Sequence, residues 1–138
     1  MLIVEDEAIV ALELELAVSD AGHQVAGVAG DRLEAGEIAA EGRVDIALVD
    51  INLRDGRTGV DIASDLSRSH GSLVIFLTAN PDQVPADFTD ALGVYPKPYD
   101  IEAVTDLLRF AGAVRADRSS GIPPKRFQMA RWLSQLRA

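Results

Sequence analysis

Residues that can do chemistry follow four apolar segments of this sequence. The segments cover residues 1–4, 46–49, 73–77 and 93–95, and the residues close after them are Glu5, Asp6, Asp50, Thr78 and Lys97. Apolar runs that are closed by turn residues predict strands buried on both faces of a parallel sheet. Ligands bind beyond the carboxyl ends of such strands, so we expect these residues to meet at one site.

Three of these residues are carboxylates, and they converge if the first and third strands are neighbours. At a separation of about 5 Å and an effective dielectric near 20, each like-charged pair costs roughly 3 kcal/mol. That is a large share of the ~5–15 kcal/mol by which a domain is stable. A cation must therefore offset the repulsion. Oxygen ligands without His or Cys are typical of Mg²⁺, which favours one or two carboxylates together with a phosphate.

The other two residues fit a phosphoryl group better than a neutral substrate. Lys97 supplies a fixed positive charge and Thr78 a hydroxyl donor, while Asp50 is placed to attack phosphorus in line. The expected product is an aspartyl phosphate at Asp50.

The rest of the chain predicts the elements that must position these groups. Helical patterns cover residues 8–21, 32–41 and 58–70 and the segment after Asp100, and they alternate with five strands. We expect the first two helices to face the core with Ile9, Leu12, Leu16 and Ala17 and with Leu33, Ile38 and Ala39. Pro81 and Pro85 make the segment up to Ala91 a poor helix, which predicts a mobile connection. The alternation indicates an α/β fold, a doubly wound, five-stranded parallel sheet with helices on both faces.

Composition bounds the class of protein. The 138 residues carry a net charge of −9 and no cysteine, and no apolar run has the roughly 20 residues that a membrane helix needs. We expect a cytoplasmic protein with no membrane contact. Residues 1–114 hold 7 basic and 21 acidic side chains, which predicts repulsion of nucleic acid, whereas residues 115–138 hold 6 and 1. Residues 117–124 indicate a linker, and 125–138 a basic amphipathic tail helix with Met129, Trp132, Leu133 and Leu136 on one side.

The strand-end residues, in this order, resemble the receiver domain of two-component response regulators. The resemblance covers about residues 1–114 and implies a receiver domain over 1–116, with the flavodoxin-like strand order 2-1-3-4-5. It implies that Glu5, Asp6, Asp50 and the backbone carbonyl of Asn52 hold Mg²⁺. It also implies that Asp50 accepts phosphate from a histidine kinase or phosphotransferase, that Thr78 moves toward the phosphoryl group and that Lys97 pairs with it. The Lys97-Pro98 bond is often cis in that family.

Two positions depart from the usual receiver pattern. Arg54 stands where the family has proline four residues after the phosphorylated aspartate, and Val94 stands where a switch aromatic precedes the lysine by three residues. The segment from Asp50 to Asp61 is similar to receivers of the general-stress-response type. Phe76-Leu77-Thr78 partly resembles the Phe-Ala-Thr motif of atypical stand-alone receivers. With the switch aromatic absent, we expect phosphorylation to order the segment from Asn80 to Ala91.

These observations predict a single-domain response regulator, not an enzyme acting on other substrates. It would signal to a protein partner of unknown identity, as a monomer or weak dimer. A phosphorelay shuttle or phosphate sink is the alternative within that class. A haloacid-dehalogenase-like phosphatase also uses a strand-end aspartate but needs a second one as general acid, where this chain has Asn52. A flavodoxin-like cofactor binder needs a phosphate-cradling first loop, whereas the loop here is anionic.

Overall fold

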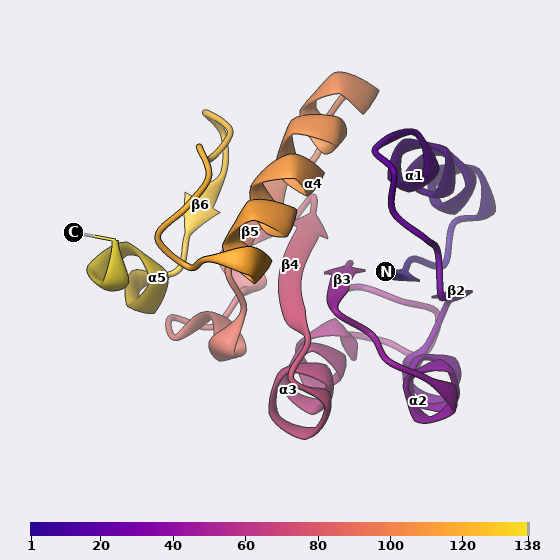
Figure 1. The fold of residues 1–138 in the computed structure, drawn as a ribbon. Coiled ribbons are helices and arrows are strands. Elements are labelled where there is room, and N and C mark those ends of the chain that lie inside the picture. The colour runs from indigo at the N-terminus through magenta and orange to yellow at the C-terminus, as the bar shows by residue number, and fades with distance from the viewer. Residues whose placement is uncertain (138) are drawn as a thin grey trace.

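The computed structural model describes residues 1–137 and confirms the alternation of strands and helices (Figure 1). The strands are β1 (Leu2–Val4), β2 (Gly27–Ala29), β3 (Ile46–Val49), β4 (Leu73–Thr78), β5 (Gly93–Pro96) and β6 (Gln128–Met129). The helices are α1 (Ala8–Asp20), α2 (Arg32–Glu41), α3 (Gly59–His70), α4 (Ile101–Ala116) and α5 (Arg131–Leu136). Two 3-10 turns, η1 (Pro81–Gln83) and η2 (Phe88–Asp90), fill the connection between β4 and β5.

The sheet has the order β2-β1-β3-β4-β5-β6, and β1 to β5 are parallel. The expected order of the first five strands is confirmed. Helices α1 and α4 cover one face, and α2 and α3 cover the other (Figure 1). Val4 of β1 pairs with Val49 of β3, so the two strands end side by side and the acidic residues after them start from the same edge.

Two hydrophobic clusters, one on each face of the sheet, hold these layers together. Residues that alternate along a strand divide between the clusters: Leu48 and Ile75 pack toward α1 and α4, whereas Val49 and Phe76 pack toward α2 and α3. All four are at most 1% exposed. A strand buried on both faces reads as a continuous apolar run, which is why the sequence predicts these strands well.

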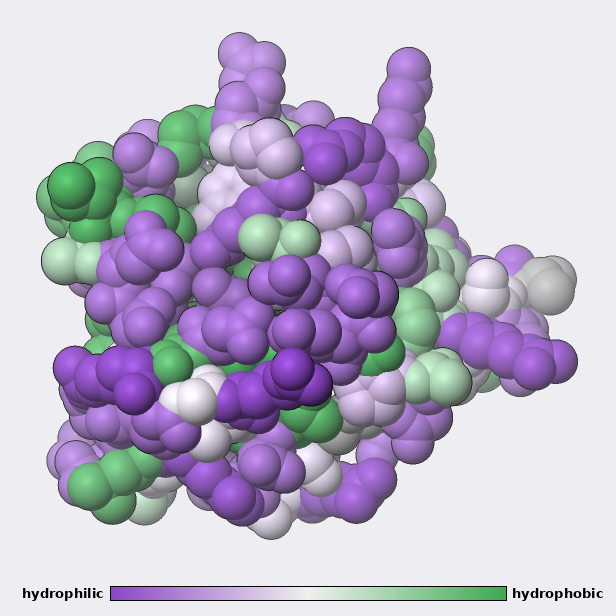
Figure 2. Space-filling model, turned by 180° about the vertical axis from the view of Figure 1, so that it is seen from behind, coloured by the Kyte–Doolittle hydropathy of each residue, from purple (hydrophilic) through white to green (hydrophobic). Residues whose placement is uncertain are grey.

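The predicted inward faces of α1 and α2 were wrong in part. Ile9, Leu12, Leu16 and Leu33 are all more than half exposed. Ala17 and Ala39 are buried as expected, and Ile38 packs against the core. The other buried residues of α1 are Ala11, Leu14 and Val18. Apolar residues lie on all sides of α1, so helical periodicity does not select one face. On α2, the buried residues are the small Ala35 and Ala39, which allow the helix to lie close to its neighbours. Figure 2 shows hydrophobic side chains gathered at the upper left, on the side where α1 lies in that view.

The prediction of a single tail helix over 125–138 was also wrong. Gln128–Met129 form strand β6, antiparallel to β5, and the helix begins only at Arg131. The reason is that β5 would otherwise be an edge strand with unpaired backbone groups, which β6 satisfies. Gly93 makes the pairing possible, because a Cβ atom there would lie 2.2 Å from the carbonyl oxygen of Gln128. Residue 138 lies outside the described part of the chain.

The tail belongs to the folded core. Leu133 is fully buried, and the Trp132 indole donates a hydrogen bond to the Ala91 carbonyl at 2.9 Å. Phe127 contacts the ring of Phe110 on α4 edge to face. The guanidinium of Arg137 donates to three backbone carbonyls of the preceding loop, at Arg118, Ser120 and Gly121.

Candidate phosphoryl-transfer site

Lys97 joins two of the carboxylates at the carboxyl end of the sheet. Its ammonium Nζ donates to Glu5 Oε1 at 2.8 Å and to Asp50 Oδ2 at 3.0 Å. The group is well shielded, since the Lys97 side chain is 20% exposed, that of Asp50 13% and that of Glu5 1%. The three residues come from the ends of β1, β3 and β5, which meet at this edge. The ammonium is therefore the cation that offsets the repulsion between Glu5 and Asp50 in this structure.

Burial and pairing shift the pKa values of this group. Desolvation raises the pKa of Glu5, and the hydrogen bond from Lys97 opposes that shift without cancelling it. Desolvation by itself lowers the pKa of Lys97, but the bonds to Glu5 and Asp50 outweigh it and the pKa rises. Lys97 is therefore a permanent cation at neutral pH, held between two acceptors.

Backbone amides hold the remaining carboxylate oxygens. The N–H of Ile51 donates to Asp50 Oδ1 at 2.7 Å, and the N–H of Asp6 donates to Glu5 Oε2 at 3.0 Å. Asp50 thus has one oxygen fixed by its own loop and the other by Lys97. These two hydrogen bonds fix the orientation of the Asp50 carboxylate before any ligand binds.

The other expected metal ligands lie at the same edge but are not drawn into this ion pair. Asp6 is exposed, and Asn52 is exposed with its amide donating to Gln83 of η1 at 3.0 Å. Within residues 1–137, no three His, Cys, Asp or Glu side chains are grouped closely enough to hold a metal ion. Of the three carboxylates expected to converge, Glu5 and Asp50 share Lys97 as a partner, and Asp6 lies beside them with its side chain exposed.

Thr78 lies at the end of β4 and is fully buried. Its hydroxyl oxygen accepts from the N–H of Asn80 at 3.0 Å, and its carbonyl accepts from the N–H of Lys97 at 2.9 Å. Thr78 is therefore adjacent to Lys97 in the sheet, as the sequence predicts. The Lys97-Pro98 peptide bond is cis, in agreement with the expectation.

Gly59 packs against the backbone of Asp50. The sequence predicted Gly59 only as part of the start of a helix and gave no indication of a role at the site. Gly59 opens α3, and its N–H donates to the carbonyl of Ile51 at 3.0 Å. A Cβ atom at this position would lie 2.0 Å from the Asp50 carbonyl oxygen. Only glycine lets α3 begin this close to the end of β3.

Arg54, one of the two departures from the receiver pattern, fastens the loop after Asp50 to α2. Its guanidinium pairs with Asp31 at 3.1 Å and with Glu34. In return, the N–H of Arg32 donates to Asp55 at 3.1 Å. Asp31 also caps α2 by accepting from the N–H of Glu34. The opposite charges at 31, 34 and 54 were the only sequence signal for this contact.

Val94 and Tyr95, at the second departure, face opposite sides of the sheet. Val94 packs in the cluster under α2 and α3, and Tyr95 packs in the cluster under α1 and α4. The ring of Tyr95 lies beneath the guanidinium of Arg126 and contacts Tyr99 edge to face. The aromatic ring on β5 is therefore turned away from the face that a switch residue at 94 would occupy.

A family model for the response regulator receiver domain matches residues 1–109. The chain belongs to this family. The receiver domain is 45% identical over 84 residues to the phyllosphere-induced regulator PhyR of Methylorubrum extorquens, covering 60% of this chain and 32% of that protein. It is 33% identical over 79 residues to the transcriptional regulatory protein PdtaR of Mycobacterium tuberculosis, covering 57% and 38%. The chain therefore spans about a third of the length of these curated relatives.

Solved structures agree with this placement. The receiver domain of PhyR from Erythrobacter litoralis superposes with a TM-score of 0.73 at 33% identity, covering 80% of this chain and 86% of that one. PhyR from Brucella abortus gives 0.68 at 28% identity, covering 86% and 52%. These matches confirm the resemblance to receiver domains of the PhyR type. No helix among residues 1–137 is long and apolar enough to cross a membrane.

Proposed function

We propose that this receiver domain takes a phosphoryl group on Asp50 and signals through the protein surface that it then presents. The observation that supports this most directly is the sharing of one largely shielded ammonium by Glu5 and Asp50 at the end of the sheet. An ammonium held this way is ready to neutralise added negative charge on Asp50 without rearrangement of distant groups.

The transfer itself needs only Asp50 and a phosphorylated nitrogen donor. A carboxylate oxygen of Asp50 attacks phosphorus as the phosphorus–nitrogen bond to a phosphohistidine breaks, and the released imidazole nitrogen takes up a proton. Lys97 pairs with a phosphoryl oxygen, and the Thr78 hydroxyl is the further donor nearby. The donor would be a histidine kinase or a histidine phosphotransferase, in keeping with membership of the receiver family.

The donor set fits Mg²⁺ as the cofactor. Asp6 offers an exposed carboxylate directly beside Glu5, and Asp50 and the carbonyl of Asn52 lie at the end of the neighbouring strand. We assign these four residues as the Mg²⁺ ligands, directly or through water. When bound, the metal supplies charge that stabilises the transferring phosphoryl group.

The output is proposed to be contact with another protein, as a signal or as a relay of phosphate to a further regulator. A related structure, from Bartonella quintana, is described as an anti-anti-sigma factor PhyR, at 31% identity and covering 44% of that chain. This indicates control of sigma factors as the class of pathway. The acidic surface of residues 1–114 fits a protein partner better than nucleic acid.

The test is phosphoryl uptake followed by intact mass. With Mg²⁺ and a small phosphodonor, the protein is expected to gain one phosphoryl group, and Asp50→Asn none. Asp55→Asn is the matched control, since Asp55 is an exposed carboxylate in the same loop, and it should behave like the unaltered protein. Equal uptake by Asp50→Asn would refute the proposal.

A further inference from the structure

A small cavity adjoins the ion pair on the side of α1. It has a volume of about 300 Å³ and is lined by Val10, Glu13, Ala79, Lys97, Pro98 and Tyr99. Two of these residues belong to the site itself, since Lys97 pairs with Asp50 and Ala79 directly follows Thr78. The cavity therefore borders the ion pair through Lys97, the residue that contacts Asp50.

Tyr99 brings an unused hydrogen-bonding group to this cavity. Its hydroxyl oxygen is buried and has no hydrogen-bond partner among residues 1–137. The hydroxyl interacts electrostatically with Lys97, Glu5, Asp50 and Glu13, so it lies within the field of the site. Burial raises the pKa of Tyr99 to about 12, and the phenol therefore carries its proton at neutral pH. A buried hydroxyl without a protein partner costs free energy, and a ligand or a water molecule that accepts its hydrogen bond removes that cost.

We infer that the Tyr99 hydroxyl is a hydrogen-bond donor to the phosphoryl group on Asp50, directly or through one water in this cavity. This inference rests on the proposed phosphorylation of Asp50. Lys97 already donates to two carboxylates, so one ammonium cannot satisfy all the added oxygens of a phosphoryl group. Tyr99 supplies a further donor two residues after Lys97, in the same loop between β5 and α4, and its hydroxyl gains a partner only when Asp50 is phosphorylated.

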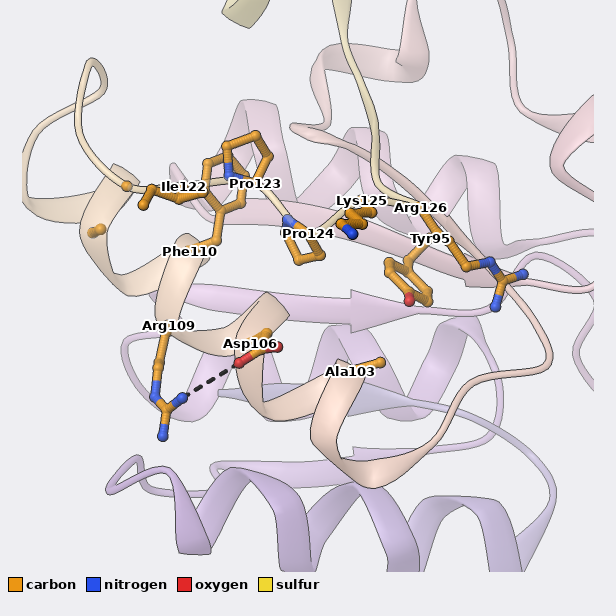
Figure 3. Close-up of a pocket in the computed structure, with 12 residues that line it drawn as sticks. Tyr95, Ala103, Asp106, Arg109, Phe110, Ile122, Pro123, Pro124, Lys125 and Arg126 are labelled. Carbon is orange, nitrogen blue, oxygen red and sulfur yellow. Dashed lines mark hydrogen bonds and ion pairs between the residues drawn. The ribbon is translucent and has the colours of Figure 1, made fainter.

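Tyr95 provides a matched control for the same chemical change. It lies four residues earlier and contacts the Tyr99 ring edge to face, with centroids 6.5 Å apart. Tyr95 lines a different groove, of about 840 Å³, between α4 and residues 121–126 (Figure 3). Removing its hydroxyl leaves both rings in place and does not touch the cavity beside Lys97.

The experiment compares Tyr99→Phe with Tyr95→Phe in two measurements. The first is the dissociation constant for beryllofluoride, a phosphoryl mimic, in the presence of Mg²⁺. Because hydrogen bonds to charged groups are strong, Tyr99→Phe is expected to weaken binding by about tenfold and Tyr95→Phe to leave it unchanged. The second is the melting temperature of the unphosphorylated protein, which Tyr99→Phe should raise or leave unchanged, because it removes an unpaired buried hydroxyl.

The two measurements separate a role at the site from a role in packing. Beryllofluoride binding by Tyr99→Phe equal to that of the unaltered protein overturns the inference. So does a weakened affinity that comes with a lowered melting temperature, since lost packing would produce both. If Tyr99→Phe still gains a phosphoryl group that depends on Asp50, the proposed function stands although the inference has failed. If the unaltered protein takes up neither phosphoryl group nor mimic, both fail together.

Discussion

Burial makes the negative charge of Glu5 costly to the folded protein. Its side chain is almost fully buried, and burial raises its pKa despite the hydrogen bond from Lys97. A carboxyl whose pKa is higher in the folded than in the unfolded protein binds its proton more tightly when folded. The free energy of unfolding therefore falls as the pH rises from about the ordinary value of 4.5 through the raised pKa.

Glu5→Gln removes this ionisation while keeping the shape of the side chain. We expect the variant to be more stable than the unaltered protein above the raised pKa, by on the order of 1 kcal/mol, because Lys97 keeps Asp50 as its partner. The difference should shrink as the pH falls toward 4.5. Urea unfolding across this pH range measures it, with exposed Glu41→Gln on α2 as the control. A stability gain that does not change with pH would show that Glu5 ionisation is not its cause.

The sequence predicted which residues form the site, but it did not predict how their side chains are paired. Strand-end positions identified Glu5, Asp50, Thr78 and Lys97, because parallel strands that follow one another along the chain end at one edge. The sequence did not reveal that Lys97 bridges two carboxylates, since side-chain reach depends on the three-dimensional distance between strands. Tyr99 carried no sequence signal either, because an aromatic residue before a helix is ordinarily part of the core.

At the scale of elements, the close approach of α3 to β3 fixes the backbone of Asp50. Gly59→Ala would place a methyl group 2.0 Å from the Asp50 carbonyl oxygen, a distance that one of the two elements must relieve by moving. We expect a loss of about 1–3 kcal/mol in the free energy of unfolding, the usual cost of inserting atoms into a well-packed region. Phosphoryl uptake at Asp50 should slow as well.

Gly36→Ala is the matched control, because Gly36 lies in α2 with no atom within 4 Å of an added Cβ. That variant is expected to gain about 0.5–1 kcal/mol, since alanine favours helix more than glycine does. Thermal unfolding of both variants checks the pair. The close-approach argument is wrong if Gly59→Ala proves as stable as Gly36→Ala.

Strands that are buried on both faces could be predicted from the sequence, whereas the buried face of a helix that packs on one side was harder to predict. The strands buried on both faces came out near their observed bounds, and Asp31 and Asp100 cap α2 and α4 as side-chain acceptors. Most of the buried face of α1 was missed, because Ile9, Leu12 and Leu16 are as apolar as the residues that do pack. The face of α1 that becomes buried is decided by where the sheet and α4 lie, which local sequence does not show.

At the scale of the whole molecule, the C-terminal segment completes the domain. Strand β6 covers the edge of β5, and Arg126 donates to the Pro98 carbonyl just after Lys97. The tail thus contacts the same loop that presents the site's lysine. The helical spacing of Met129, Trp132, Leu133 and Leu136 predicted a helix over all of 125–138. The need to pair the edge of β5 cannot be seen in local periodicity.

Leu133→Ala tests whether this tail is part of the core in solution. Leu133 is fully buried in α5, so its truncation is expected to cost about 2–5 kcal/mol in the free energy of unfolding. Leu136→Ala, in the same helix but 55% exposed, should change the stability by less than about 0.5 kcal/mol. Denaturant titrations of the two variants give the comparison. Equal and small effects would mean that α5 is detached from the domain.

The most direct test of the account is chemical identification of the residue that carries the phosphoryl group. Acyl phosphates are reduced by borohydride, and reduction of a phosphorylated aspartate leaves homoserine, which peptide mass spectrometry locates. After reaction with a small phosphodonor and Mg²⁺, we predict homoserine at position 50 alone. Homoserine at Asp6 or Asp55, or no reduced residue in protein that has gained a phosphoryl group, would contradict the account.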